Sequence, residues 1–267
     1  MKVVLFCGGL GLRIREHSEH IPKPMVRIGY RPVLWHVMRY YAHYGHKDFV
    51  VCLGYKADVV KRYFLDYDET LSNDFVLSQG GGDRRVDLLG SDIDDWRITF
   101  LDTGLYAKIG MRLKAAQSQL ENEDLFLANY GDVLTDAPLP SLIEDFKKRD
   151  AVAAFIRVPP SYTFHVVGMK DDHHVSHIED IKTTGIWLNG GYFIFRPEIF
   201  DYLHEGEELV QEPFRRLIQE NKLISYAHEG FWAPMDTVKE RQALEAMFES
   251  GQPPWAVWQR EPSRASA

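Results

Sequence analysis

The sequence predicts an α/β fold in which a mixed, mostly parallel sheet carries helices on both faces. Short apolar segments alternate with amphipathic segments of helical periodicity, a pattern typical of parallel sheets. The first apolar segment leads directly into three closely spaced glycines, Gly8, Gly9 and Gly11. Asp132 follows another apolar segment, and open α/β sheets bind their ligands at the carboxyl ends of strands. We therefore expect a ligand site at one edge of this sheet.

The elements are expected in the following order. Residues 2–6 form the first strand, and residues 32–44 form a helix whose apolar side chains recur every three or four positions until Gly45 ends it. Further strands are predicted over 49–53, 97–101, 125–128, 151–158, 191–195 and 223–226. Further helices are predicted over 57–65, 103–120 (capped by Thr103), 138–148, 197–203, 212–220 and 236–249.

Three segments depart from this alternation. Residues 66–95, with their glycine and aspartate clusters, predict a loop or irregular insertion, either a solvated loop or a mobile segment at an interface. Residues 160–188 predict polar strands and loops. The tail contains Trp255 and Trp258, and exposed aromatic residues commonly mark interfaces, so we expect subunit contacts and a homo-oligomer.

Composition excludes several classes of protein. The chain has 267 residues, of which 45% are hydrophobic, and a net charge of −8 with a pI near 5.8, which argues against nucleic acid as a partner. Neither a signal-peptide pattern nor a run of transmembrane length is present, so we expect no membrane partner and a cytoplasmic location. Cys7 and Cys52 lie in apolar runs and are expected to be buried free thiols. The histidines at 173, 174 and 177 lack the spacing of known zinc motifs.

The glycine-rich loop suggests phosphate binding. Glycines let backbone N–H groups approach an anion, and Arg13 and Lys23 add positive charge. Position 14 is isoleucine, so the third glycine of a dinucleotide fingerprint is missing, and no Gly-Lys-Ser/Thr of a Walker loop occurs. A tight turn with surface cations remains the alternative.

The segment from Leu5 to Met25, with Gly-Gly, a third glycine, an arginine and Pro-Lys-Pro, resembles the signature of sugar-1-phosphate nucleotidylyltransferases. The resemblance covers almost the whole chain and is strongest to the glucose-1-phosphate cytidylyltransferase branch. Its further motifs include Asp102-Thr103-Gly104, Arg112-Leu113-Lys114, Tyr130-Gly131-Asp132, Asn189-Gly190-Gly191 and Met235-Asp236-Thr237.

The resemblance implies a Rossmann-like nucleotidyltransferase fold and an enzyme that makes an NDP-sugar and pyrophosphate from a nucleoside triphosphate and a sugar 1-phosphate, with CTP preferred and Mg²⁺ as cofactor. It implies one domain over 1–267, with a nucleotide-binding half (1–158), a sugar-phosphate-binding half (159–235) and a terminal helix and tail (236–267). UTP, dTTP or GTP in place of CTP is the alternative within this chemistry.

The resemblance also assigns roles to individual residues. It places the catalytic charges on Arg13 at the leaving pyrophosphate, on Lys23 at the α-phosphate and on Asp132. The metal ligands are Asp132 and Asp236. The nucleotide contacts are Gly8, Gly9, Gly11, Arg13, Lys23, Thr103, Gly104, Arg112 and Gly131, and the sugar-phosphate contacts are Glu179, Lys182, Asn189 and Gly190. Without the resemblance, Asp132 and Asp236 could equally cap a helix or occupy a surface turn, and Arg112 could be a helix-surface residue.

The sequence departs from the family pattern in three places. Leu12 replaces a threonine, the family's Glu-Lys-Pro appears as Glu179-Asp180-Ile181-Lys182, and residues 162–165 lack a glycine that allows the sugar to approach. An acidic side chain in place of a phosphate-binding lysine repels a dianion. We therefore expect that the acceptor differs from glucose 1-phosphate. A non-catalytic nucleotide-sensing or assembly subunit is the alternative from another class.

Overall fold

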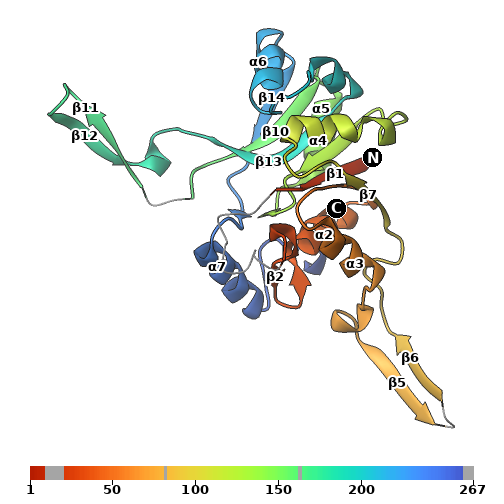
Figure 1. Cartoon of the computed structure of the whole chain (residues 1–267). Helices are drawn as coiled ribbons and strands as arrows, with labels where there is room; N and C mark the ends of the chain where they lie inside the picture. The colour runs from red at the N-terminus through yellow and green to blue at the C-terminus, as the bar shows by residue number, and fades with distance from the viewer. Residues whose placement is uncertain (10–20, 81–82, 162–163, 261–267) are drawn as a thin grey trace, which may run out of the picture.

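The computed structural model describes residues 1–9, 21–80, 83–161 and 164–260. Its centre is a seven-stranded sheet in the order β14-β10-β13-β8-β1-β4-β7 (Figure 1). Neighbouring strands are parallel except where β13 pairs antiparallel with β8 and β10, which confirms the predicted mixed, mostly parallel sheet. The strands are β1 (Lys2–Cys7), β4 (Asp48–Leu53), β7 (Arg97–Asp102), β8 (Phe126–Asn129), β10 (Ala153–Val158), β13 (Leu188–Phe195) and β14 (Leu223–Ala227).

The sheet has an apolar core on each face because β1 alternates its side chains between them. Val3, Leu5 and Cys7 belong to one buried cluster, while Val4 and Phe6 belong to the other. The first cluster is completed by α2 (Val33–His43), α3 (Ala57–Leu65), α5 (Leu139–Lys147) and α7 (Val238–Glu249). The second is completed by α4 (Ile109–Ala115), η6 (Pro197–Tyr202) and α6 (Glu212–Gln219), so the expected helices on both faces are present.

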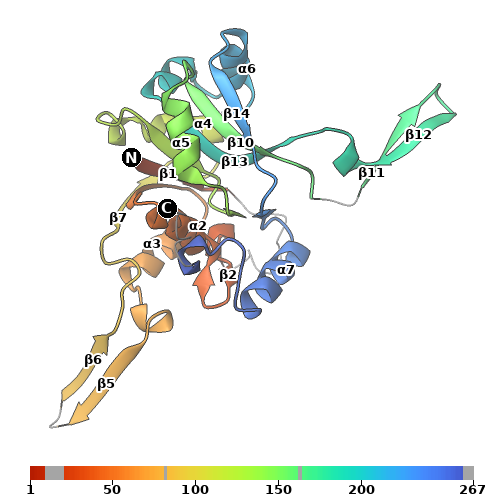
Figure 2. The ribbon, with the colours of Figure 1, turned by 180° about the vertical axis from the view of Figure 1, so that it is seen from behind.

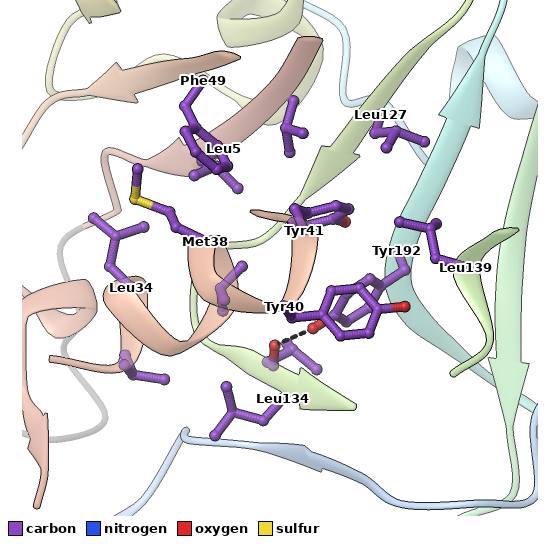
Figure 3. Close-up of a cluster of buried hydrophobic side chains, with 14 of the residues drawn as sticks. Leu5, Leu34, Met38, Tyr40, Tyr41, Phe49, Leu127, Leu134, Leu139 and Tyr192 are labelled. Atoms are coloured by element: carbon purple, nitrogen blue, oxygen red, sulfur yellow. Dashed lines mark hydrogen bonds between the residues drawn. The ribbon is translucent and has the colours of Figure 1, made fainter. Parts of the chain in front are cut away.

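Helix α2 is fixed to the sheet by tyrosines. The rings of Tyr40 and Tyr41 lie 5.4 and 5.8 Å from that of Tyr192 on β13 (Figure 3). The Tyr192 hydroxyl donates to the carbonyl of Val133 at 2.7 Å, and the Tyr40 hydroxyl donates to the carbonyl of Ala137 at 2.8 Å. Buried phenols thus find acceptors in the segment that follows β8 and hold it in place.

Two antiparallel ribbons project from the body of the molecule in different directions (Figures 1 and 2). One pairs β5 (Phe75–Gly80) with β6 (Asp83–Leu88), and the other pairs β11 (His165–Met169) with β12 (Val175–Asp180). The prediction of an irregular insertion over 66–95 is therefore wrong in part, because β5 and β6 form a regular ribbon within this segment, preceded by the short helix η3 (Glu69–Leu71).

Two smaller sheets complete the fold near the site. The pair β2 (Arg27–Ile28) and β3 (Arg31–Pro32) precedes α2, and the pair β9 (Val133–Thr135) and β15 (Trp232–Pro234) joins the segment after β8 to the segment before α7. No helix among the described residues is long and apolar enough to cross a bilayer.

The predicted helix over 103–120 is too long, because α4 begins only at Ile109 and Lys108 occupies the N-cap. Thr103 does not cap it. Its hydroxyl instead donates to the carbonyl of Leu53 at 2.7 Å and accepts a hydrogen bond from Arg112 at 2.6 Å. The predicted helix over 197–203 is the 3₁₀ helix η6.

The predicted exposure of the aromatic tail is wrong for Trp255, whose side chain is 1% exposed. Its ring lies 5.9 Å from that of His36 on α2, and its indole N–H donates to His36 Nδ1 at 3.3 Å. Trp258 also packs against the first cluster. The tail therefore completes this chain's own core.

Candidate active site

The carboxyl ends of β1, β4, β7 and β8 meet at one edge of the sheet, and each is followed by glycine within a few residues. A Cβ on Gly54, directly after β4, would lie 2.7 Å from the carbonyl oxygen of Gly8 and 2.8 Å from that of Gly104. These backbones approach one another more closely than a side chain permits. Gly54 was not among the predicted site residues, although a glycine that directly follows a buried strand is the signal that could have identified it.

Arg112 holds this edge together from inside. The residue is 2% exposed, and its guanidinium donates to the carbonyls of Leu53 at 3.1 Å, Gly8 at 3.0 Å and Leu105 at 3.3 Å. Burial lowers its pKa, yet an arginine stays charged at any physiological pH. A Cβ on Gly8 would lie 1.8 Å from Nη1 of Arg112. The structure thus places Arg112 behind the predicted nucleotide loop, as a residue that positions three strand ends.

Two other predicted nucleotide contacts, Gly9 and Gly104, lie at the open side of the same edge. Among the described residues, a Cβ on either would meet nothing within 4 Å, and Gly104 has a φ of +90°. Gly11 and Arg13 lie outside the described residues.

Gly131 shapes the turn that presents Asp132. Its φ is +74°, and a Cβ there would lie 2.8 Å from the sulfur of Cys7. The backbone N–H of Gly131 donates to the side chain of Asn129 at 2.7 Å, which stabilises the turn. Cys7 is a buried free thiol, as is Cys52, which confirms that prediction, and burial raises the pKa of both thiols.

The small sheet of β9 and β15 brings the two predicted metal ligands together. Asp132 directly precedes β9 and Asp236 follows β15, and the strands are antiparallel with Pro234 opposite Val133. The backbone N–H of Met235 also donates to the carbonyl of Asp132 at 3.0 Å. This pairing places two carboxylates side by side although they come from different parts of the chain.

Lys23 lies between these carboxylates. Its ammonium group contacts Asp132 Oδ2 and Asp236 Oδ1, and its side chain is only 11% exposed. Burial alone would lower the pKa of Lys23, but the two carboxylates, Asp132 foremost, outweigh it and the pKa is raised. Lys23 begins the short helix η2 (Lys23–Met25) between Pro22 and Pro24, whose rings restrict the backbone that carries this charge.

Asp236 is positioned by the start of α7. Thr237 caps this helix with a capping box, in which its side chain accepts from the N–H of Glu240. Glu240 in turn accepts from the N–H groups of Asp236 at 2.7 Å and Thr237 at 2.8 Å. The sequence reasoning had not identified Glu240, although a threonine followed three residues later by glutamate is a recognisable signal.

The predicted sugar-phosphate residues fall into two groups. Asn189 and Gly190 lie at the start of β13, at the same edge as Asp132, and the amide of Asn189 donates to the hydroxyl of Tyr130 at 3.3 Å. Glu179 lies on β12 of the β11–β12 ribbon, which projects away from this edge (Figure 2), and Lys182 lies in the short 3₁₀ helix η5 (Ile181–Thr183) that directly follows β12. The structure brings the first pair to the site and not the second, and the sugar-phosphate role of Glu179 and Lys182 stays a prediction.

The carboxylates suit a divalent cation. Asp132 and Asp236 both reach one cationic nitrogen, so their oxygens converge on a single point, and Mg²⁺ is commonly held by one or two carboxylates together with phosphate oxygens. The described residues contain no group of three or more potential ligands that could hold a metal by itself. The donor set thus fits a metal that arrives with a phosphate ligand.

Fold and site together define an α/β protein whose ligand-binding edge carries close-packed glycines and a lysine shared by two carboxylates. The chain belongs to the nucleotidyl transferase family, whose model matches residues 2–240, and it is therefore a nucleotidyltransferase. It is 34% identical to the glucose-1-phosphate cytidylyltransferases of Salmonella typhimurium and Salmonella typhi, over 97% of this chain and 100% of each relative. A solved UDP-glucose pyrophosphorylase in complex with UDP-glucose matches 94% of this chain and 99% of its own with a TM-score of 0.67 at 13% identity, which supports the fold.

Proposed function

We propose that this protein is a Mg²⁺-dependent sugar-1-phosphate cytidylyltransferase, which forms a CDP-sugar and pyrophosphate from CTP and a sugar 1-phosphate. The observation that supports this most directly is the contact of Lys23 with both Asp132 and Asp236. The choice of CTP rests on relatives whose names give that activity and which match this chain from end to end.

The reaction would be a single in-line displacement. An oxygen of the acceptor phosphate attacks the α-phosphorus of CTP, the bond from that phosphorus to the bridging oxygen of the β-phosphate breaks, and pyrophosphate leaves with the bonding electron pair. Several negative charges meet in this step, so positive charge and correct placement supply most of the catalysis. Bound at the two carboxylates, Mg²⁺ would supply part of this charge.

Lys23 would supply positive charge from the protein itself. In the structure its ammonium group pairs with both Asp132 and Asp236, and its raised pKa keeps it protonated. Once a triphosphate and its metal reach the carboxylates, the ammonium group would be free to contact the α-phosphate. The exchange of one ion pair for another keeps the local charge balanced.

Pyrophosphate release in the presence of Mg²⁺ tests the proposal. CTP, UTP, dTTP, GTP and ATP are each combined with a panel of sugar 1-phosphates that includes glucose 1-phosphate. We expect release with CTP, its loss in EDTA, and its loss in Asp132→Asn and Asp236→Asn. Asp150→Asn is the matched control, because Asp150 is 94% exposed and pairs with Lys222. Release that prefers another nucleotide would overturn the base assignment.

The acceptor is proposed separately. Asp180 is the last residue of β12 and Lys182 lies in η5 directly after it, in the part of the chain that projects from the body (Figure 1). We therefore propose that the preferred acceptor differs from glucose 1-phosphate, as another sugar 1-phosphate or a phosphorylated polyol. Efficient turnover of glucose 1-phosphate with CTP would contradict this part and leave the reaction class intact.

A further inference from the structure

Arg157 lies beside the predicted sugar-phosphate residues, although sequence reasoning gave it no role. It is the penultimate residue of β10 and is directly opposite Asn189 of β13 in the antiparallel register. Residues opposite one another on antiparallel strands point to the same face of a sheet. Arg157 therefore shares a face with Asn189, whose amide contacts Tyr130, two residues before Asp132.

The local backbone is irregular in a way typical of functional sites. The register between β10 and β13 shifts between Phe155 and Arg157, and Gly191 in this stretch has a φ of +74°. Irregular pairing of this kind re-aims side chains and is common next to active sites. The carbonyl of Gly190 is held by the indole N–H of Trp232 at 2.8 Å, which fixes the strand start beside Arg157.

The guanidinium of Arg157 is held from one side only. Nη1 donates to the carbonyl and to the hydroxyl of Ser225 on β14, both at 2.8 Å. The guanidinium carbon lies 5.0 Å from the centre of the Trp187 ring, a cation–π contact. Among the residues that the structure describes, the partners of this guanidinium are Ser225 and Trp187, and Nε and Nη2 make no hydrogen bond. One edge of the guanidinium is fixed, and the Nε–Nη2 edge remains available.

That available edge has the geometry to bind an oxyanion. Nε and Nη2 present parallel N–H groups that match two oxygens of one carboxylate or phosphate. Strand β10 is two positions from β8 in the sheet, so Arg157 is about 10 Å from the strand that leads to Asp132 at a spacing of about 4.8 Å per strand. This separation can be spanned jointly by the arginine side chain and a sugar phosphate that lies beside Asp132 and Asp236.

We propose that Arg157 is an acceptor-binding residue whose Nε–Nη2 edge takes an oxyanion of the acceptor, a role that rests on the proposed transferase function. The oxyanion is either the acceptor's phosphate, which would make Arg157 the replacement for the missing family lysine, or a carboxylate on the sugar. Ser225 and Trp187 orient the guanidinium for this contact.

The test compares Arg157→Ala, Arg157→Lys and Arg157→Gln with a matched control, Arg196→Ala. Like Arg157, Arg196 donates to a backbone carbonyl and contacts an aromatic ring: it donates to the carbonyl of Ala151 at 2.9 Å and lies 5.3 Å from the centre of the Phe146 ring. It lies, however, at the opposite end of β13. We expect Arg157→Ala to raise the KM of the acceptor about tenfold to a hundredfold and to leave the KM of CTP within about twofold. Arg157→Lys should restore little of the affinity for the acceptor, because a lysine lacks the paired N–H groups of a guanidinium. Arg196→Ala should lower the Tm about as much as Arg157→Ala does and leave the KM values of the acceptor and of CTP unchanged.

Two acceptors distinguish the sources of the oxyanion. If Arg157 binds the phosphate, Arg157→Ala raises the KM of glucose 1-phosphate and of glucuronic acid 1-phosphate by the same factor. If it binds a carboxylate, only the KM of glucuronic acid 1-phosphate rises. An unchanged KM for both, or an equal rise in the KM of CTP, would overturn the proposal.

The proposed function can fail separately. If the wild-type protein releases no pyrophosphate with any pair of substrates, the transferase assignment for CTP and sugars is wrong. Calorimetry with glucose 1-phosphate and glucuronic acid 1-phosphate then decides the role of Arg157. Binding that weakens in Arg157→Ala and not in Arg196→Ala supports it, whereas absent or unchanged binding refutes it.

Discussion

Asp132 and Asp236 lie on either side of one ammonium group, that of Lys23, because β9 and β15 pair in antiparallel fashion. The arrangement gathers into one place residues from the beginning, the middle and the end of the chain. The contribution of the Lys23 charge can therefore be tested by replacing this one side chain.

Replacing Lys23 with methionine should abolish most of the activity. The variant keeps a flexible side chain of similar length and removes the charge, so we expect the rate of pyrophosphate release to fall by at least about a hundredfold. Lys182→Met is the comparison, because the resemblance assigns Lys182 to the sugar phosphate while the structure places it in the short helix η5, directly after the β11–β12 ribbon. A Lys23→Met enzyme with half of the wild-type rate would contradict the role given to Lys23.

Removing the guanidinium of Arg112 should destabilise the nucleotide edge. Arg112→Ala leaves the carbonyls of Gly8, Leu53 and Leu105 without these donors, and we expect a loss of about 3 kcal/mol in the free energy of unfolding and a higher KM for CTP. Urea denaturation and steady-state kinetics provide the two readouts. Lys114→Ala is the control on the same helix, because Lys114 is exposed and donates only to the carbonyl of Phe200. Equal stabilities of Arg112→Ala and the wild type would show that the buried network contributes nothing.

Alanine at Gly54 should be far more harmful than alanine at Gly9. The new Cβ at Gly54 would meet two backbone carbonyl oxygens at 2.7 and 2.8 Å, and backbone cannot rotate away as a side chain can. We expect the free energy of unfolding to fall by about 1–3 kcal/mol in Gly54→Ala. In Gly9→Ala it should change by less than about 0.5 kcal/mol, because a Cβ at that position meets no described residue within 4 Å. The measurement is the thermal midpoint of each variant. Equal midpoints for Gly54→Ala and Gly9→Ala would contradict the predicted clash at Gly54.

The buried ring of His36 should make the protein less stable in mild acid. Burial lowers the pKa of His36 from 6.5 to about 4, because a charged ring is costly between Ile28 and Trp255. The unfolded chain binds this proton more readily than the folded protein does. The contribution of the neutral His36 ring to the free energy of unfolding, about 3 kcal/mol in total, is therefore complete above pH 6.5 and is lost as pH falls towards 4.

The measurement is the free energy of unfolding at pH 7.5 and pH 4.5. In His36→Gln, which cannot titrate, the difference between the two pH values should shrink by about 2–3 kcal/mol. Burial also lowers the pKa of His46 to about 4, so part of the acid sensitivity should remain.

Much of the fold could be predicted from local pattern. The strands and helices of the sheet produce clear periodicities, and α3 spans Ala57–Leu65 as expected. Thr103 was misassigned because its hydroxyl binds the end of β4, a partner that no local pattern reveals. The segment 66–95 was misassigned because its ribbon has apolar residues on a fully exposed hairpin, so burial does not mark its strands.

The candidate site residues could be named from the sequence, whereas their arrangement in space could not. Glycines and charged residues near strand ends identified Gly8, Lys23, Asp132 and Asp236, but the pairing of β9 with β15 that joins the two carboxylates is a long-range contact. Arg112 was predicted to contact the nucleotide. In the structure its guanidinium donates hydrogen bonds to backbone carbonyls at the strand ends. Arg157 had no motif, and its position became visible only through its register with Asn189.

The docking of Trp255 onto His36 has a consequence for synthesis on the ribosome. Helix α2 is made early, but part of its apolar surface acquires its cover only when the last described segment of the chain emerges. Until then this part of the aromatic surface lacks the cover it has in the finished fold, and transiently exposed apolar surface promotes aggregation. A truncation that ends before Trp255 would make this transient exposure permanent.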